Sequence, residues 1–154
     1  MSPQALPTPL HLALFQPDMA GNMGAAMRLC ACLGISLDVI EPCGFVWDDR
    51  KMDRAAMDYR DLCDLKRHAD WDAFLTQKTG RIVLLTTKGA QSLYETAFQP
   101  GDILLAGRES AGAPDFVHDA ADCRVKIPLH GPARSLNLVT ACAIACGEAL
   151  RQLS

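Results

Sequence analysis

Short apolar runs separated by helical patterns constrain the fold of this 154-residue chain more than any other feature of its sequence. Residues 12–15 form a short apolar run that ends at Gln16-Pro17, and residues 36–40 form a second run. Between them lies a pattern typical of a helix that begins at Asn22 and stops at Gly34. A strand, a helix and a strand within about 30 residues predict a βαβ unit. We therefore predict an α/β fold, with a parallel sheet flanked by helices.

Three further predicted strands run directly into polar loops. Residues 81–85 are followed by the loop 86–89, residues 102–106 by the loop 107–112, and residues 125–127 by a loop that contains proline and glycine. In open parallel sheets, ligands bind in the crevice beyond the carboxyl ends of the strands. We therefore expect any site to be built from these three loops.

The loop at residues 107–112, with the sequence GRESAG, matches none of the common glycine-rich motifs. No Lys-Ser or Lys-Thr follows Gly112, as a P-loop requires. The spacing G-x-x-S-x-G is one residue longer than a nucleophile elbow, and the three glycines of a dinucleotide fingerprint are not in register. Small residues let the backbone approach a flat ligand, and Glu109 offers a hydrogen-bond acceptor. A purely structural turn is the alternative interpretation.

The C-terminal stretch combines a polar loop with an apolar helix. Ser135 and Asn137 suit a helix start, where a side-chain oxygen can accept a hydrogen bond from an unpaired backbone N–H. Residues 138–146 are almost all apolar or small, which predicts a helix buried on every side. A core helix behind a tight turn explains the apolar run but not the cluster at residues 134–137. Both interpretations stay open on this stretch alone.

Length and composition indicate one folded domain spanning residues 1–154, with residues 1–10 as a disordered or extended tail. Hydrophobic residues make up 49% of the chain and charged residues 21%, which excludes an intrinsically disordered protein. No apolar run reaches membrane-spanning length, and the first ten residues carry no basic residue. We therefore expect a soluble, cytoplasmic protein with no membrane partner.

Seven cysteines without a C-x-x-C pair, and four histidines in no ligand spacing with them, form no metal-binding pattern. We expect no metal, and reduced cysteines that serve as small core residues. The net charge of −3 argues against general nucleic-acid binding but allows a local basic patch. Residues 48–67 carry six basic residues and six aspartates, which favours a solvated helix face.

Three separated segments form a specific combination through their order and spacing. They are Asn22-x-Gly24-x-x-x-Arg28, Gly107-x-Glu109-x-x-Gly112, and Ile127-Pro128 followed by Arg134-Ser135-Leu136-Asn137-Leu138. Together they resemble the SpoU-type branch of the SPOUT methyltransferases, which transfer a methyl group from S-adenosylmethionine to an RNA ribose.

The intervening sequence resembles one small subfamily, the TrmL/YibK-like enzymes of the tRNA wobble nucleotide. The matching stretches lie at residues 40–49, 57–59 and 85–89, and the resemblance covers roughly residues 11–153. Ala111 departs from the pattern, because the subfamily usually carries an arginine there. A contact to cofactor or RNA is then either missing or supplied elsewhere.

The resemblance implies a five- or six-stranded parallel sheet whose C-terminal segment is threaded into a trefoil knot. It implies a homodimer packed through the first and last helices. It also implies transfer of a methyl group to the ribose 2′-hydroxyl of nucleotide 34, cytidine or uridine, in tRNA-Leu-type substrates. The anticodon stem-loop would be the RNA partner, contacted by basic residues among Arg50, Lys51, Arg54 and Arg60.

The resemblance also implies the residues of the site. S-adenosylmethionine would be the cofactor, S-adenosylhomocysteine the product, and no metal would take part. The residues expected to act on the ribose are Asn22, Arg28, Ser135 and Asn137. The residues expected to hold the cofactor are Leu85, Thr86, Gly107, Glu109, Ile127, Ser135 and Leu136.

Two other functions are compatible with the sequence. An acyl-transfer hydrolase would use Ser135 or Ser110 with His130, although neither an elbow nor a suitably spaced acid supports it. A non-catalytic RNA-binding module would keep a vestigial cofactor pocket, and Ala111 is its only support.

Overall fold

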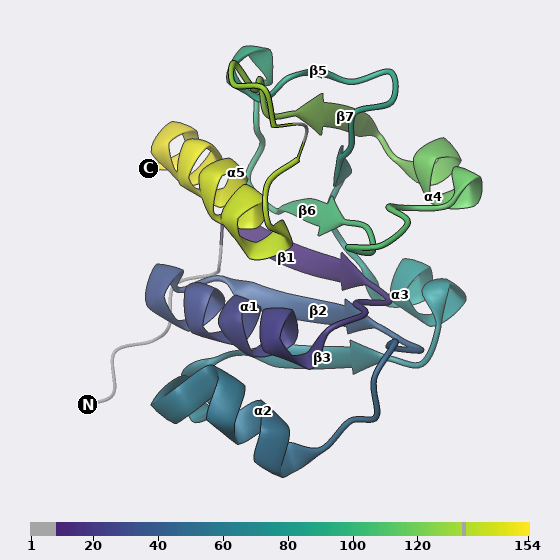
Figure 1. The fold of residues 1–154 in the computed structure, drawn as a ribbon. Coiled ribbons are helices and arrows are strands. Elements are labelled where there is room, and N and C mark those ends of the chain that lie inside the picture. Colours follow the sequence, from purple (N-terminus) through teal and green to yellow (C-terminus); the bar gives the residue numbers. More distant parts are fainter. Residues whose placement is uncertain (1–8, 134) are drawn as a thin grey trace.

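The computed structural model describes residues 9–133 and 135–154 and contains a seven-stranded sheet (Figure 1). The strand order is β3-β2-β1-β6-β4-β7-β5, and every neighbouring pair is parallel. The strands are β1 (Leu10–Phe15), β2 (Ser36–Ile40), β3 (Leu65–His68), β4 (Ile82–Leu85), β5 (Gln91–Ser92), β6 (Asp102–Ala106) and β7 (Cys123–Lys126). The α-helices are α1 (Ala20–Leu33), α2 (Asp49–Ala56), α3 (Trp71–Gln77), α4 (Asp115–Ala120) and α5 (Leu138–Leu153), and the 3₁₀ helices are η1 (Met57–Leu62) and η2 (Leu93–Glu95).

The prediction of a parallel α/β sheet is confirmed, but the expected number of strands, five or six, is wrong. The two strands without a sequence signal, β3 and β5, form the two edges of the sheet. β3 carries Lys66 and Arg67, and β5 has only two residues. Edge strands are often short and charged, so they lack the apolar run that marks a central strand. The charged region 48–67 is therefore not one helix face but α2, η1 and part of β3.

Helices cover both faces of the sheet, α1, α2 and α5 on one side and α3 and α4 on the other (Figure 1). Successive side chains of β1 alternate between the two sides: Leu12 and Leu14 pack toward α1 and α5, and Ala13 and Phe15 pack toward α3 and α4. A strand buried on both faces needs apolar residues at every position. This explains the uninterrupted apolar runs of the sequence.

β1 begins at Leu10, which is fully buried and lies inside the stretch expected to be a tail. Residues 1–8 of that expected tail lie outside the described residues. The helix expected from Asn22 begins at Ala20 instead, and its N-cap residue, Met19, makes no capping side-chain bond. The expected end is confirmed, because Gly34 has a φ of 69° and donates its N–H to the Cys30 carbonyl.

The expectation that α5 is buried on every side is wrong for the single chain. Its buried residues, Cys142, Ala145, Cys146 and Ala149, recur at one-turn spacing and face the sheet. Thr140 and Gly147 on the remaining surface are exposed. The expected start is confirmed, since the Asn137 side chain accepts hydrogen bonds from Val139 N at 2.9 Å and Thr140 N at 3.2 Å.

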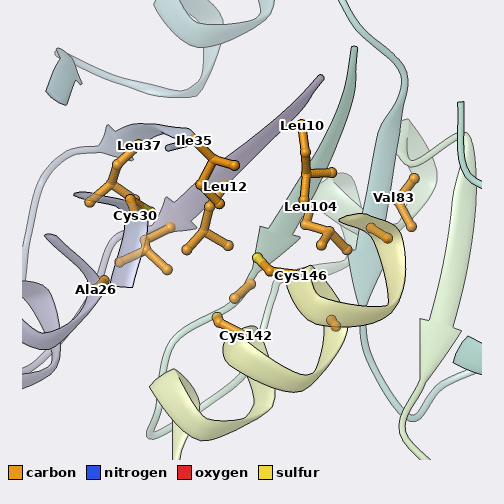
Figure 2. Close-up of a cluster of buried hydrophobic side chains, with 14 of the residues drawn as sticks. Leu10, Leu12, Ala26, Cys30, Ile35, Leu37, Val83, Leu104, Cys142 and Cys146 are labelled. Atoms are coloured by element: carbon orange, nitrogen blue, oxygen red, sulfur yellow. The ribbon is translucent and has the colours of Figure 1, made fainter. Parts of the chain in front are cut away.

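Cys30, Cys142 and Cys146 are small core residues, as predicted, while Cys32 is exposed. Figure 2 shows Cys142 and Cys146 on the side of α5 that faces the sheet. All seven cysteines are free thiols. Burial raises the pKa of Cys146 to about 12, so this thiol is not a reactive nucleophile.

Among the described residues, no helix has the length and apolar character needed to cross a membrane. The same part of the chain contains no group of three or more His, Cys, Asp or Glu side chains arranged to hold a metal ion.

Candidate active site

A cavity of about 380 Å³ lies at the carboxyl ends of three neighbouring strands, β6, β4 and β7. Parallel strands present their carboxyl ends at the same edge of the sheet, so the three polar loops meet there although the sequence separates them. The N-terminal ends of α1 and α5 complete the wall. The lining residues are Met19, Asn22, Leu85, Thr86, Thr87, Ala106, Gly107, Arg108, Glu109, Gly112, Val125, Lys126, Ile127, Leu129, Ser135, Leu136, Asn137, Leu138 and Ala141.

The loop after β6 is closed on itself by its backbone. Arg108 N donates to the Gly112 carbonyl at 3.2 Å, and Gly112 N donates to the Arg108 carbonyl at 2.9 Å. A Cβ on Gly107 would lie 2.4 Å from Ala113 N, and Gly112 has a φ of 68°. Steric limits therefore favour glycine at both positions, and the loop keeps its backbone at the cavity surface.

Glu109 connects this loop to the start of α1. Its carboxylate accepts hydrogen bonds from the Asn22 side chain at 3.0 Å and from Asp18 N at 2.9 Å. The Asn22 Oδ1 in turn accepts from Asn137 Nδ2 at 3.3 Å, and Asn137 caps α5. One chain of hydrogen bonds thus joins the three segments that carried the family resemblance.

Thr86, at the end of β4, is held by a residue that no sequence pattern selected. His118 of α4 is buried, and its Nε2 lies 2.8 Å from Thr86 Oγ1. The other ring nitrogen lies 3.2 Å from the Pro114 carbonyl, which can only accept. In the neutral ring, Nδ1 therefore carries the hydrogen and Nε2 accepts from the Thr86 hydroxyl.

Apolar side chains form the remaining wall. Leu85, Ile127 and Leu136, which the resemblance implies as cofactor contacts, line the cavity together with Leu129. Leu129 and Leu136 are among the large apolar side chains that stay exposed in the chain. Together they offer an apolar surface to a flat ligand such as an adenine ring.

Arg28 is the one predicted site residue that does not line the cavity. It lies six residues beyond Asn22, about 9 Å along the helix axis and on another side of the helix. Its guanidinium carbon is 5.0 Å from the ring centroid of Tyr59 in η1, and the side chain is exposed. The structure therefore brings Asn22, Ser135 and Asn137 together and keeps Arg28 apart from them. Arg134 lies outside the described residues.

The arrangement required for an acyl-transfer hydrolase is not formed by the described residues. Ser110 Oγ donates to Asp18 Oδ2 at 2.5 Å, and this bond is the main cause that lowers the pKa of the Asp18 carboxyl. No described histidine is hydrogen bonded to Ser110 or Ser135. Within the described residues, neither serine therefore has the histidine base that such a hydrolase requires.

The profile of the SpoU rRNA Methylase family matches residues 9–147, which is most of the chain. The chain belongs to this family. The SpoU assignment agrees with the family resemblance found in the sequence, and it explains why three distant segments converge on one cavity.

Individual proteins match the chain more specifically than the family profile does. The chain is 53% identical over 145 residues to the tRNA (cytidine(34)-2'-O)-methyltransferase of Beijerinckia indica, covering 92% of this chain and 91% of that protein. It also matches a solved structure described as "Structural insights into the 2-OH methylation of C/U34 on tRNA", with a TM-score of 0.89, 42% identity and coverage of 96% and 98%. The SpoU methyltransferase AviRb from Streptomyces viridochromogenes, solved with the cofactor AdoMet, matches with a TM-score of 0.83 and 25% identity. That match covers 96% of this chain and 62% of AviRb.

Proposed function

We propose that this chain is a tRNA (cytidine/uridine-34-2′-O)-methyltransferase that uses S-adenosylmethionine. The similar proteins named above support this reaction, and they match nearly the whole chain. The single structural observation that carries it is the link Glu109–Asn22–Asn137, because it joins a glycine loop to two helix starts at one cavity. We also propose that tRNA-Leu-type molecules are substrates through their anticodon stem-loop, and that the protein acts in the cytoplasm.

The residues around the cavity fit the cofactor. Gly107 lines the cavity at a place where the loop backbone leaves no space for a Cβ, and Leu85, Ile127 and Leu136 provide apolar walls. These residues, with Thr86, Glu109 and Ser135, would hold the adenosyl group. When bound, S-adenosylmethionine supplies a methyl group on a sulfonium centre, and S-adenosylhomocysteine is released.

The residues at the two helix starts would orient the ribose. Asn22 and Asn137 hold each other's side chains, so each presents a fixed amide toward the cavity. Ser135 is exposed and lines the cavity beside them. A methyl transfer to oxygen is an in-line displacement, so this positioning contributes directly to the rate.

We propose that Arg28 positions the RNA and does not act as a base. A guanidinium is not deprotonated in proteins, but its fork binds phosphate through two hydrogen bonds. The proton of the 2′-hydroxyl would pass to a substrate phosphate or to water. Glu109 already accepts two hydrogen bonds and is unsuited to take that proton.

We propose that two copies of the chain pack through α1 and α5. This would explain why the surface of α5 that faces away from the sheet carries small and apolar residues such as Ala143, Ile144 and Gly147. A dimer would also let Arg28 of one copy approach RNA bound to the other. Light scattering at micromolar concentration tests this, and a monomer would contradict it.

We also propose that the C-terminal segment forms the trefoil knot. The return of α5 across β1 and β6, after the chain has formed β7 beyond β4, supports this threading.

The methyltransferase is tested by incubating the protein with labelled S-adenosylmethionine and tRNA, followed by mass spectrometry of the nucleosides. We expect a ribose-methylated cytidine or uridine, and loss of the product from a tRNA with a 2′-deoxy nucleotide 34. The vestigial module suggested by Ala111 predicts cofactor binding without turnover. If the protein does not bind the cofactor at all, both the methyltransferase and the vestigial module are rejected.

A further inference from the structure

Arg108 is a cation in the cavity wall with unused hydrogen-bonding capacity. It lines the cavity between Gly107 and Glu109. Its Nη2 donates to Gln16 Oε1, whereas its Nε is buried and no group in residues 9–133 or 135–154 accepts from it. A buried polar group without a partner is rare in folded proteins and calls for a specific explanation, such as a bound ligand.

The carboxylates nearest to Arg108 accept their hydrogen bonds from other groups. The Asp18 carboxylate accepts from both Ser110 N and Ser110 Oγ. Glu109 accepts from Asn22 and from Asp18 N. Within the described part of the chain, neither forms an ion pair with Arg108. Arg108 still helps to lower the pKa of the Asp18 carboxyl from a distance, but its Nε–H donates to no carboxylate, and an anionic ligand group would be the natural acceptor.

The residue that holds Arg108 has an uncommon backbone conformation. Gln16 has a φ of 45° and is the only non-glycine residue with a positive φ in the described part of the chain. Its N–H is fixed by the Ile40 carbonyl at 2.8 Å, which ties the position to β2. The side chain of Gln16 can then fix the orientation of Arg108 from the end of β1.

We propose that Arg108 binds the carboxylate of the methionine portion of S-adenosylmethionine. The Nε–H and the second hydrogen of Nη2 lie on one edge of the guanidinium and match the two oxygens of a carboxylate. This inference rests on the proposed function, since it assigns the cofactor's only anionic group to a residue. With Ala111 uncharged, Arg108 is the one guanidinium of the loop 107–112.

The burial of Nε favours a cofactor carboxylate over an RNA phosphate. Backbone phosphates of a folded RNA are held by side chains that extend from the surface, such as Arg50 or Arg54, which are exposed. A phosphate at the protein surface does not reach this shielded N–H, whereas a carboxylate inside the cavity reaches it after a small rotation of the guanidinium. The cavity volume suits a ligand of the size of S-adenosylmethionine.

The test measures the affinity of two cofactors for two proteins by calorimetry. The cofactors are S-adenosylmethionine and its decarboxylated form, which keeps the sulfonium, the amine and the adenosine. We expect wild-type protein to bind S-adenosylmethionine about 10- to 100-fold more tightly than the decarboxylated form. We expect Arg108→Met to bind the two about equally, and Arg108→Lys to show an intermediate preference because it keeps the charge and loses the fork.

Two controls separate the loss of this contact from a general loss of positive charge and from a failure to fold. Lys88→Met removes a cation from an exposed position beside the cavity and should leave the preference unchanged. A thermal melt of each variant identifies one that does not fold, and Arg108→Gln then replaces Arg108→Met.

Two results would overturn the inference. One is an Arg108→Met protein that folds and still prefers S-adenosylmethionine by the wild-type factor. The other is an unchanged cofactor affinity with a loss of tRNA binding, which would assign Arg108 to the RNA. If wild-type protein binds neither cofactor, the proposed function itself fails.

Discussion

The cavity and the basic region formed by α2 and η1 are organised in different ways. Around the cavity, hydrogen bonds connect residues far apart in sequence, 87 residues between Asn22 and Glu109 and 115 between Asn22 and Asn137. In the basic region the contacts are exposed and more local. Arg60 pairs with Asp49 at 2.7 Å across 11 residues.

This difference matches the ligands we propose for the two regions. A cofactor is small and constant, so its site gains from a backbone and side chains fixed in advance. An RNA backbone is contacted by exposed cations whose effects are individually small and screened by salt. Single changes should therefore be severe at the cavity and mild in the basic region.

The largest effect is expected from Gly107→Ala. The new Cβ would lie 2.4 Å from Ala113 N and 2.5 Å from Gly112 C, so the backbone of the loop must move. We expect cofactor affinity and turnover to fall by about 100-fold or more, because displacements near 1 Å can have effects of this size. Calorimetry and methyl transfer measure this.

Two matched glycine variants control for folding. A Cβ on Gly80 would lie 1.8 Å from the Gly101 carbonyl oxygen, away from the cavity, so Gly80→Ala should lower stability without a specific loss of cofactor binding. Gly21→Ala meets no atom within 4 Å and should be tolerated. If Gly107→Ala and Gly80→Ala lost cofactor affinity equally at matched stability, the loss would come from destabilisation of the fold and not from the loop.

Arg28→Lys should be the next most severe change. It keeps the charge but loses the planar fork, and we expect turnover to fall by about 100-fold with cofactor affinity nearly unchanged. Single-turnover kinetics across a pH series measure both. Full recovery of the rate at high pH would contradict positioning and favour a base. Tyr59→Leu, which removes the ring beneath Arg28, should have a smaller effect in the same direction.

Asn137→Ser should have an intermediate effect at the cavity. Serine can still cap α5, but its shorter side chain does not reach Asn22, so we expect about tenfold lower turnover with little change in stability. Asn137→Ala loses the cap as well and should lower the free energy of unfolding by about 1 kcal/mol more. Turnover is compared with denaturant unfolding of both variants. Wild-type turnover in Asn137→Ser would show that the link between the helix starts is not used.

The smallest effects are expected in the basic region. Arg50→Gln and Arg54→Gln should each weaken tRNA binding by about threefold and reduce its salt dependence, with cofactor affinity unchanged. Lys78→Gln makes the same charge change at the C-terminal end of α3, where Lys78 donates to the Gly80 carbonyl, and should have no effect. Filter binding at several salt concentrations tests this. A loss of 100-fold from either arginine would mean that the region is as specifically arranged as the cavity.

Much of the fold followed from local sequence. Apolar runs predicted β1, β2, β4, β6 and β7, and the turn residues after β4, β6 and β7 predicted which edge of the sheet holds a site. Gly34 and Asn137 have the conformations that their residue types favour at helix ends. These features depend on neighbouring residues only, so a sequence pattern is enough to determine them.

Other features depend on contacts between distant segments, and only the tertiary structure decided them. The side of α5 that is buried, the placement of Arg28 over Tyr59 and the support of Thr86 by His118 all depend on how elements pack. Glu109 could accept a hydrogen bond from many donors, and the sheet order selected Asn22 and Asp18 N. The sequence determines which groups can form such bonds, whereas the close approach of strands β1 and β6 determines which pairs form.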